Sequence, residues 1–100
     1  METLAQAVER LSAAGYREDF RAEADGLRAV ASGCVHAPEE LVIEEIARFE
    51  GASDPQDQAI LFALRCDVHG VRGTYVVAYG PATAPLDARM VRRLHDGRRH

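Results

Sequence analysis

Residues 58–80 read QAILFALRCDVHGVRGTYVVAYG, and this stretch decides the fold because it predicts one β-hairpin. Two apolar runs, 58–68 and 71–80, flank His69-Gly70, which we expect to form a two-residue loop. Counting back from that loop gives the facing pairs Ile60 and Tyr79, Phe62 and Val77, Leu64 and Tyr75, Cys66 and Gly73, and the opposite-charge pair Asp67 and Arg72. A slip of one residue would send the apolar set to the other face, so the pattern predicts a defined register.

Two shorter strands, 20–24 and 27–35, are expected in the N-terminal half of the chain. Apolar and polar residues alternate on either side of Asp25-Gly26, a dipeptide typical of tight hairpin turns. This pattern predicts a second, shorter hairpin.

Residues 41–50 allow two interpretations, because their apolar positions do not keep one period. As a strand the segment needs a β-bulge near Glu44-Glu45 to keep its apolar side chains on one face. As a helix it would place Leu41, Glu45 and Phe49 on one face. The β-branched pair Val42-Ile43 favours the strand.

Helices are expected at both ends of the chain. Residues 3–14 have apolar side chains at helical spacing, and Gly15 is suited to end the helix. A second helix, 88–95, is expected to follow an N-cap at Asp87. The order of elements predicts an α+β fold with an antiparallel sheet of four to five strands.

These elements are expected to form a single domain over residues 1–96, followed by a frayed tail at 97–100. The long hairpin is apolar on both faces, and the two helices are expected to cover only one of them. Either a curled neighbouring strand or a second subunit must cover the other face, and we expect a homodimer.

Composition narrows the class of protein. The chain is 47% hydrophobic and 28% charged, which is ordinary for a globular protein, and it has neither a membrane-spanning apolar run nor a secretory signal. A cytoplasmic location without a membrane partner is expected. The net charge is −4 and all twelve basic residues are arginine, with their main concentration at the C-terminal end, so a nucleic-acid partner is not favoured.

Several stretches resemble a small family of uncharacterised bacterial proteins of about this length. The matching pieces are Gly15-Tyr16-Arg17-Glu18-Asp19-Phe20, Pro38-Glu39-Glu40-Leu41, Arg48-Phe49-Glu50-Gly51 with Asp54-Pro55, and Ala78-Tyr79-Gly80 with Pro85-Leu86. Some relatives are labelled phosphoribosylpyrophosphate synthetase, and the resemblance implies that activity. Residues 41–46 match the apolar strand and two acids of such a site, but residues 47–50 replace its phosphate-binding loop, so we do not expect this activity.

The candidate site residues are few. Arg48, Glu50 and Tyr79 would border a shallow cleft for an anion if strand 41–50 lies beside the long hairpin. His36 is a further candidate, although neither it nor His69 has a Cys, His or Asp neighbour at metal-ligand spacing along the chain. Cys34 and Cys66 are expected to be reduced.

These observations favour a non-catalytic module that binds a protein or a small anionic ligand, without a catalytic residue, metal ion or cofactor. The alternative is a metal-assisted or acid/base hydrolase that uses the acidic residues of 39–50.

Overall fold

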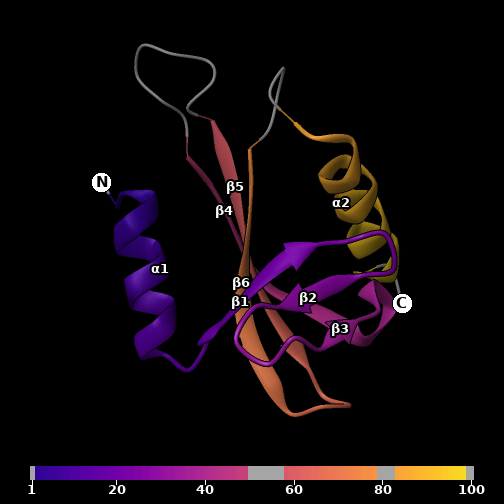
Figure 1. The fold of residues 1–100 in the computed structure, drawn as a ribbon. Coiled ribbons are helices and arrows are strands. Elements are labelled where there is room, and N and C mark those ends of the chain that lie inside the picture. Colours follow the sequence, from indigo (N-terminus) through magenta and orange to yellow (C-terminus); the bar gives the residue numbers. More distant parts are fainter. Residues whose placement is uncertain (1, 50–57, 79–82, 99–100) are drawn as a thin grey trace.

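A six-stranded mixed sheet lies between two helices in the computed structural model, which describes residues 2–49, 58–78 and 83–98 (Figure 1). In chain order the elements are α1 (Leu4–Ala13), β1 (Glu18–Ala22), β2 (Leu27–Ala29), β3 (Val35–His36), the 3-10 helix η1 (Pro38–Glu40), β4 (Leu41–Phe49), β5 (Ala59–Cys66), β6 (Val71–Ala78) and α2 (Pro85–Arg98). The strands follow the order β3-β2-β1-β6-β5-β4. The α+β class is confirmed, but the expected antiparallel sheet of four to five strands is wrong.

The sheet is mixed because β1 runs parallel to β6, with Glu18 opposite Gly73 and Phe20 opposite Tyr75. Gly73 is essential to this pairing. A Cβ atom at residue 73 would collide with the carbonyl oxygen of Glu18 and lie 2.7 Å from the Phe20 ring. The sequence pattern indicates only hairpins between consecutive strands. It could not predict this pair, because β1 and β6 are far apart in the sequence.

The long hairpin is confirmed, but its register is wrong by two residues. Cys66 pairs with Val71 rather than with Gly73, so residues 67–70 form a four-residue loop in which Gly70 has φ 67°. Because a shift of two preserves the alternation, the apolar face is the one predicted. The expected pair of Asp67 with Arg72 does not form, because Arg72 pairs with Arg65, and Asp67 in the loop lies 2.8 Å from the Arg65 guanidinium.

The short hairpin is also displaced by two residues. Ala22 pairs with Leu27, and the Glu23 amide donates to the Gly26 carbonyl, so the turn lies at Ala24 and Asp25. Gly26 is required here because a Cβ atom would collide with the His36 carbonyl oxygen, and not because of a positive φ. The predicted strand 27–35 is broken, because the chain reverses at Gly33 (φ 77°) and returns as β3.

The strand interpretation of residues 41–50 is confirmed for the described part. β4 pairs with β5 along its whole length, and the register shifts between Ile43 and Glu45, where a bulge was expected. The extra residue lets Ile43 and Ile46 pack against the same core.

α1 matches its prediction closely. Thr3 and Gln6 form a reciprocal capping box at its start, and Gly15, with φ 109°, follows its end. α2 begins at Pro85 rather than at residue 88, so Asp87 is not the N-cap. Asp87 lies in the first turn instead, where its carboxylate accepts a 2.5 Å hydrogen bond from the buried hydroxyl of Tyr75.

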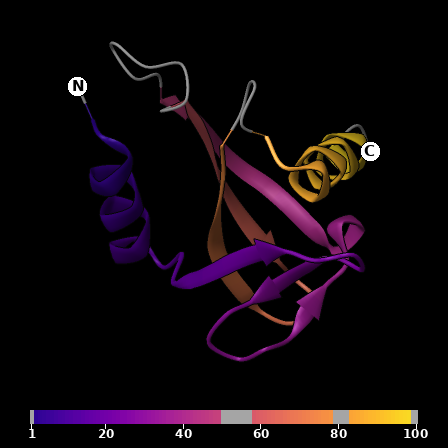
Figure 2. The same ribbon diagram turned by 45° about the horizontal axis from the view of Figure 1, so that its top comes forward.

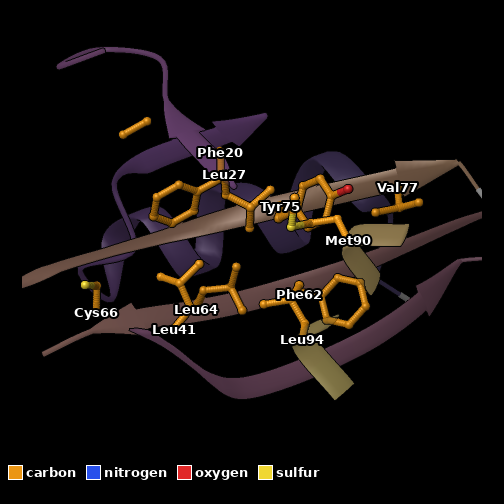
Figure 3. Packing of buried hydrophobic residues seen from close by; sticks show 11 residues of the cluster. Phe20, Leu27, Leu41, Phe62, Leu64, Cys66, Tyr75, Val77, Met90 and Leu94 are labelled. Atoms are coloured by element: carbon orange, nitrogen blue, oxygen red, sulfur yellow. The ribbon is translucent and has the colours of Figure 1, made fainter. Parts of the chain in front are cut away.

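The two helices cover opposite faces of the sheet (Figure 1). α2 contributes Met90 and Leu94 to the larger core, which Figure 3 shows packed against side chains of β1, β2, β4, β5 and β6. α1 contributes Ala7 and Leu11 to a smaller core against Leu61 and Ala63 on the other face of β5. α1 therefore covers the part of this second face that β5 forms, whereas Val76 of β6, opposite Leu61, stays 39% exposed. The oligomeric state stays a prediction.

The sheet is curled, so its two edges converge at one end (Figure 2). The edge strands β3 and β4 are joined through η1, and Leu41 at the start of β4 pairs with Cys66 at the end of β5. An ion pair of 2.9 Å between Arg93 and Glu39 ties η1 to α2. Neither α1 nor α2 has the length and apolar character to cross a membrane.

We predict that Gly73→Ala lowers the free energy of unfolding by about 1–3 kcal/mol, because the added methyl group forces β1 away from β6. Val76→Ala on the exposed side of the same strand is the control and should have a smaller effect. Urea unfolding measures both variants. Equal losses in the two variants would contradict the close approach of β1 and β6.

Candidate metal centre

Four side chains with metal-binding atoms meet at the end of the sheet where its edges converge. His36, Glu40, Cys66 and His69 each offer one donor atom, and these four atoms lie within 4.8 Å of one another. Among the described residues, this is the group of His, Cys and acidic side chains whose donor atoms converge closely enough to share one metal ion.

Two segments of the chain bring these side chains together. Cys66 ends β5, and the four-residue loop returns His69 beside it. His36 ends β3, and the single turn of η1 places Glu40 on the same side. The segments 36–40 and 66–69 thus each present two donors.

His69 Nδ1 lies at the centre of the cluster. It is 3.2 Å from His36 Nδ1, 3.3 Å from Cys66 Sγ and 3.8 Å from Glu40 Oε2. One ring nitrogen carries either one hydrogen or one lone pair, so it cannot form direct hydrogen bonds with all three atoms at once. Bonds of about 2.0–2.3 Å to a tetrahedral ion separate neighbouring ligands by roughly 3.3–3.7 Å, which is close to these distances.

The cluster has a buried half and an exposed half. His36 is 2% exposed and Cys66 is fully buried, whereas the side chains of His69 and Glu40 are 46% and 38% exposed. The ring of His36 also meets the Phe20 ring edge-on, with centroids 5.7 Å apart. The core therefore orients two donors, and the other two face the solvent side.

Burial lowers the pKa of His36, and the neighbouring His69 acts in the same direction, while Glu40 and Glu18 oppose the shift. A lowered pKa keeps the imidazole neutral near pH 7, which is the form that binds metal ions. The electrostatics of the site therefore favour a ligand role for His36 over a cationic one.

The donor set of two nitrogens, one sulfur and one oxygen is suited to Zn²⁺. Ca²⁺ and Mg²⁺ prefer all-oxygen sites, which this cluster does not offer. A Cys66 thiolate and the Glu40 carboxylate would together balance the two positive charges of the ion.

The sequence-predicted site residues are only partly brought together. His36 lies in the cluster, at the end of β3. Arg48 lies on β4, opposite Ile60 and away from His36. Glu50 and Tyr79 fall outside the described residues, so the anion cleft expected from these side chains stays a prediction.

The acidic residues of 39–50 do not converge in the part of the chain that the structure describes. Glu39 pairs with Arg93, and Glu45 pairs with Arg10. Glu44 accepts from both Arg65 and the Tyr16 hydroxyl, which raises the pKa of Tyr16. Glu40 alone among these four carboxylates joins the cluster with His36, Cys66 and His69.

The cluster was missed in the sequence because its ligands come in two pairs, and the pairs are distant from each other. The expectation that His69 lacks a neighbouring ligand at metal spacing is wrong, because Cys66 lies three positions before it across the hairpin loop. The second signal is His36-x₃-Glu40 across the turn at Pro38. Each spacing places two donors side by side when the intervening residues turn. Neither pair alone contains enough ligands for a site.

Comparisons with protein families, curated proteins and solved structures found no match to this chain.

We predict that the two thiols react at very different rates in the native protein. Cys34 is exposed and should react rapidly with a thiol reagent such as DTNB, whereas the buried Cys66 should react only as the protein unfolds. Stopped-flow absorbance should thus show one rapid thiol, which disappears in Cys34→Ser. A rapid reaction that persists in Cys34→Ser would contradict the burial of Cys66.

Proposed function

We propose that the protein is a non-catalytic binding module whose ligand is a transition-metal ion, Zn²⁺ in the first place. The observation that carries this proposal is the position of His69 Nδ1, which faces donor atoms of His36, Cys66 and Glu40 at 3.2–3.8 Å. A single cation at the centre would accept a lone pair from each of the four side chains. A direct hydrogen bond through His69 Nδ1 uses the one hydrogen or lone pair of that nitrogen, so it cannot serve all three neighbours.

The proposed role is structural because four protein ligands complete a tetrahedral shell. Catalytic zinc sites keep one position open for water or substrate. With Glu40 bound to the ion, this site has no such position. Metal-assisted hydrolysis would require Glu40 to leave, and the other carboxylates described between residues 39 and 45 are bonded to arginines.

A bound ion would connect the edge strand β3 and η1 to the end of the long hairpin. β3 has only two residues, and its neighbour in the sheet is the three-residue β2, so few backbone hydrogen bonds hold this edge. A bond from His36 to the same ion as Cys66 and His69 would fasten β3 and η1 to the long hairpin. The gain in stability would come from an interaction that the unfolded chain cannot make.

The central test is stabilisation by Zn²⁺. The native protein should bind one equivalent, and free Zn²⁺ at 100 times the dissociation constant should raise the free energy of unfolding by about 2.7 kcal/mol. Co²⁺ should give the visible absorption of a four-coordinate ion together with a thiolate-to-metal charge-transfer band. Calorimetric titration and thermal unfolding measure the binding and its effect.

Two variants identify the ligands. His69→Ala removes a partly exposed side chain and should abolish the stabilisation without unfolding the protein. Cys66→Ser should abolish the charge-transfer band, whereas Cys34→Ser, which changes the exposed cysteine, should keep it. Absence of Zn²⁺ binding by the native protein, or unchanged binding by His69→Ala, would rule out the proposed site.

A further inference from the structure

The single turn η1 carries two adjacent acidic side chains that contact different parts of the molecule. Glu40 Oε2 lies 3.8 Å from His69 Nδ1 in the candidate metal centre. Glu39 Oε1 accepts hydrogen bonds of 2.9 Å and 3.3 Å from the Nη2 and Nε atoms of Arg93 in α2. Both glutamates belong to the same three-residue element, so η1 connects the candidate metal centre directly to α2.

Backbone bonds and burial make η1 a firm connection. The Glu40 amide donates to the Ala37 carbonyl. The Leu41 amide donates to the Pro38 carbonyl, and Pro38 itself is fully buried. Leu41, which follows Glu40 in the chain, lies in the same core cluster as Leu94 of α2. A displacement of η1 would therefore disturb the packing of α2 as well as its ion pair.

α2 depends on this packing for its place on the sheet. Its main neighbours among the described elements are η1 and β4. Met90 and Leu94 are its fully buried side chains, and they lie over the core in Figure 3. A helix of 14 residues is only marginally stable in water by itself, so contacts with the rest of the fold must hold α2 in place.

The segment that carries η1 is weakly held when no ion is bound. It follows the two-residue edge strand β3, and short, poorly covered elements of this kind open locally more often than a core strand does. His36 and Glu40 stand at the two ends of residues 36–40. An ion bound to both side chains would close this segment into a ring and fasten it to the hairpin.

We propose that occupancy of the metal centre controls the release of α2 from the sheet, because an ion bound to Glu40 holds η1 and η1 holds α2. In the metal-free protein α2 detaches transiently together with η1, which uncovers Met90, Leu94 and the apolar surface beneath them. A detached η1 cannot supply Glu40 to the ion, so metal binding and α2 docking favour each other. This inference rests on the proposed metal site and adds a regulatory consequence to it.

The test is amide hydrogen exchange of the native protein with and without Zn²⁺, followed by NMR under conditions in which exchange reports the opening equilibrium. If each opening that releases α2 also breaks the site, free Zn²⁺ at 100 times the dissociation constant should slow exchange at residues 89–94 by about 100-fold. Residues 8–13 of α1 are the internal control. α1 lies on the other face of the sheet, so its local opening leaves the site intact and its exchange should not change.

Two variants trace the route through η1, each measured at free Zn²⁺ 100 times its own dissociation constant. Glu40→Ala leaves three ligands to hold the ion, which the thiolate-to-cobalt band verifies, but detaches η1 from it. The slowing in α2 should then fall below about tenfold. Glu45→Ala removes a carboxylate of similar exposure from β4, where it pairs with Arg10 of α1, and should keep the native slowing.

The coupling and the metal site fail in different ways. Zn²⁺ binding without slower exchange in α2, equal slowing in both helices, or native slowing in Glu40→Ala would overturn the coupling and leave the metal site standing. If Glu40→Ala no longer binds the ion, the comparison of the two helices in the native chain decides. Failure of the native protein to bind Zn²⁺ in the calorimeter would overturn the proposed function itself.

Discussion

The rest of the structure depends on the close approach of the two edges of the sheet at one end. β3 and β4 occupy opposite ends of the strand order, yet η1 is the short connection between them. The sheet must curl to allow this, and the curl brings β3 against the loop that follows β5. The convergence of His36 and Glu40 with Cys66 and His69 is a direct result of that closure.

The packing of the sheet supports the site. β5 is buried along most of its length because successive residues face α2 and α1 in turn, and its last residue is Cys66. Phe20, which belongs to the larger core, contacts His36. Half of the candidate metal centre is thus held by the same interactions that stabilise the fold, so little additional ordering would accompany the proposed metal binding.

The sequence predicted the features that depend on local patterns. Alternation identified the long hairpin and β4, and it located the bulge before Glu45. The predicted register of the long hairpin was wrong because His69-Gly70 suggested a two-residue loop, whereas the loop has four residues. Gly26 and Gly73 are needed for close approaches between strands and not for turns. The parallel pair β1–β6 and the cluster of His36, Glu40, Cys66 and His69 were not predicted for the same reason, since both join segments that are distant in the sequence.

The proximity of His36 to the hairpin loop is the central claim, and an NMR measurement tests it most directly in the metal-free protein. The ring of His36 lies 4.7 Å from that of His69 and 5.7 Å from that of Phe20, measured between centroids. Nuclear Overhauser effects between the ring protons of His36 and those of both other rings are therefore expected. Their absence in the folded protein, with the β5–β6 hairpin intact, would show that the edges of the sheet do not meet.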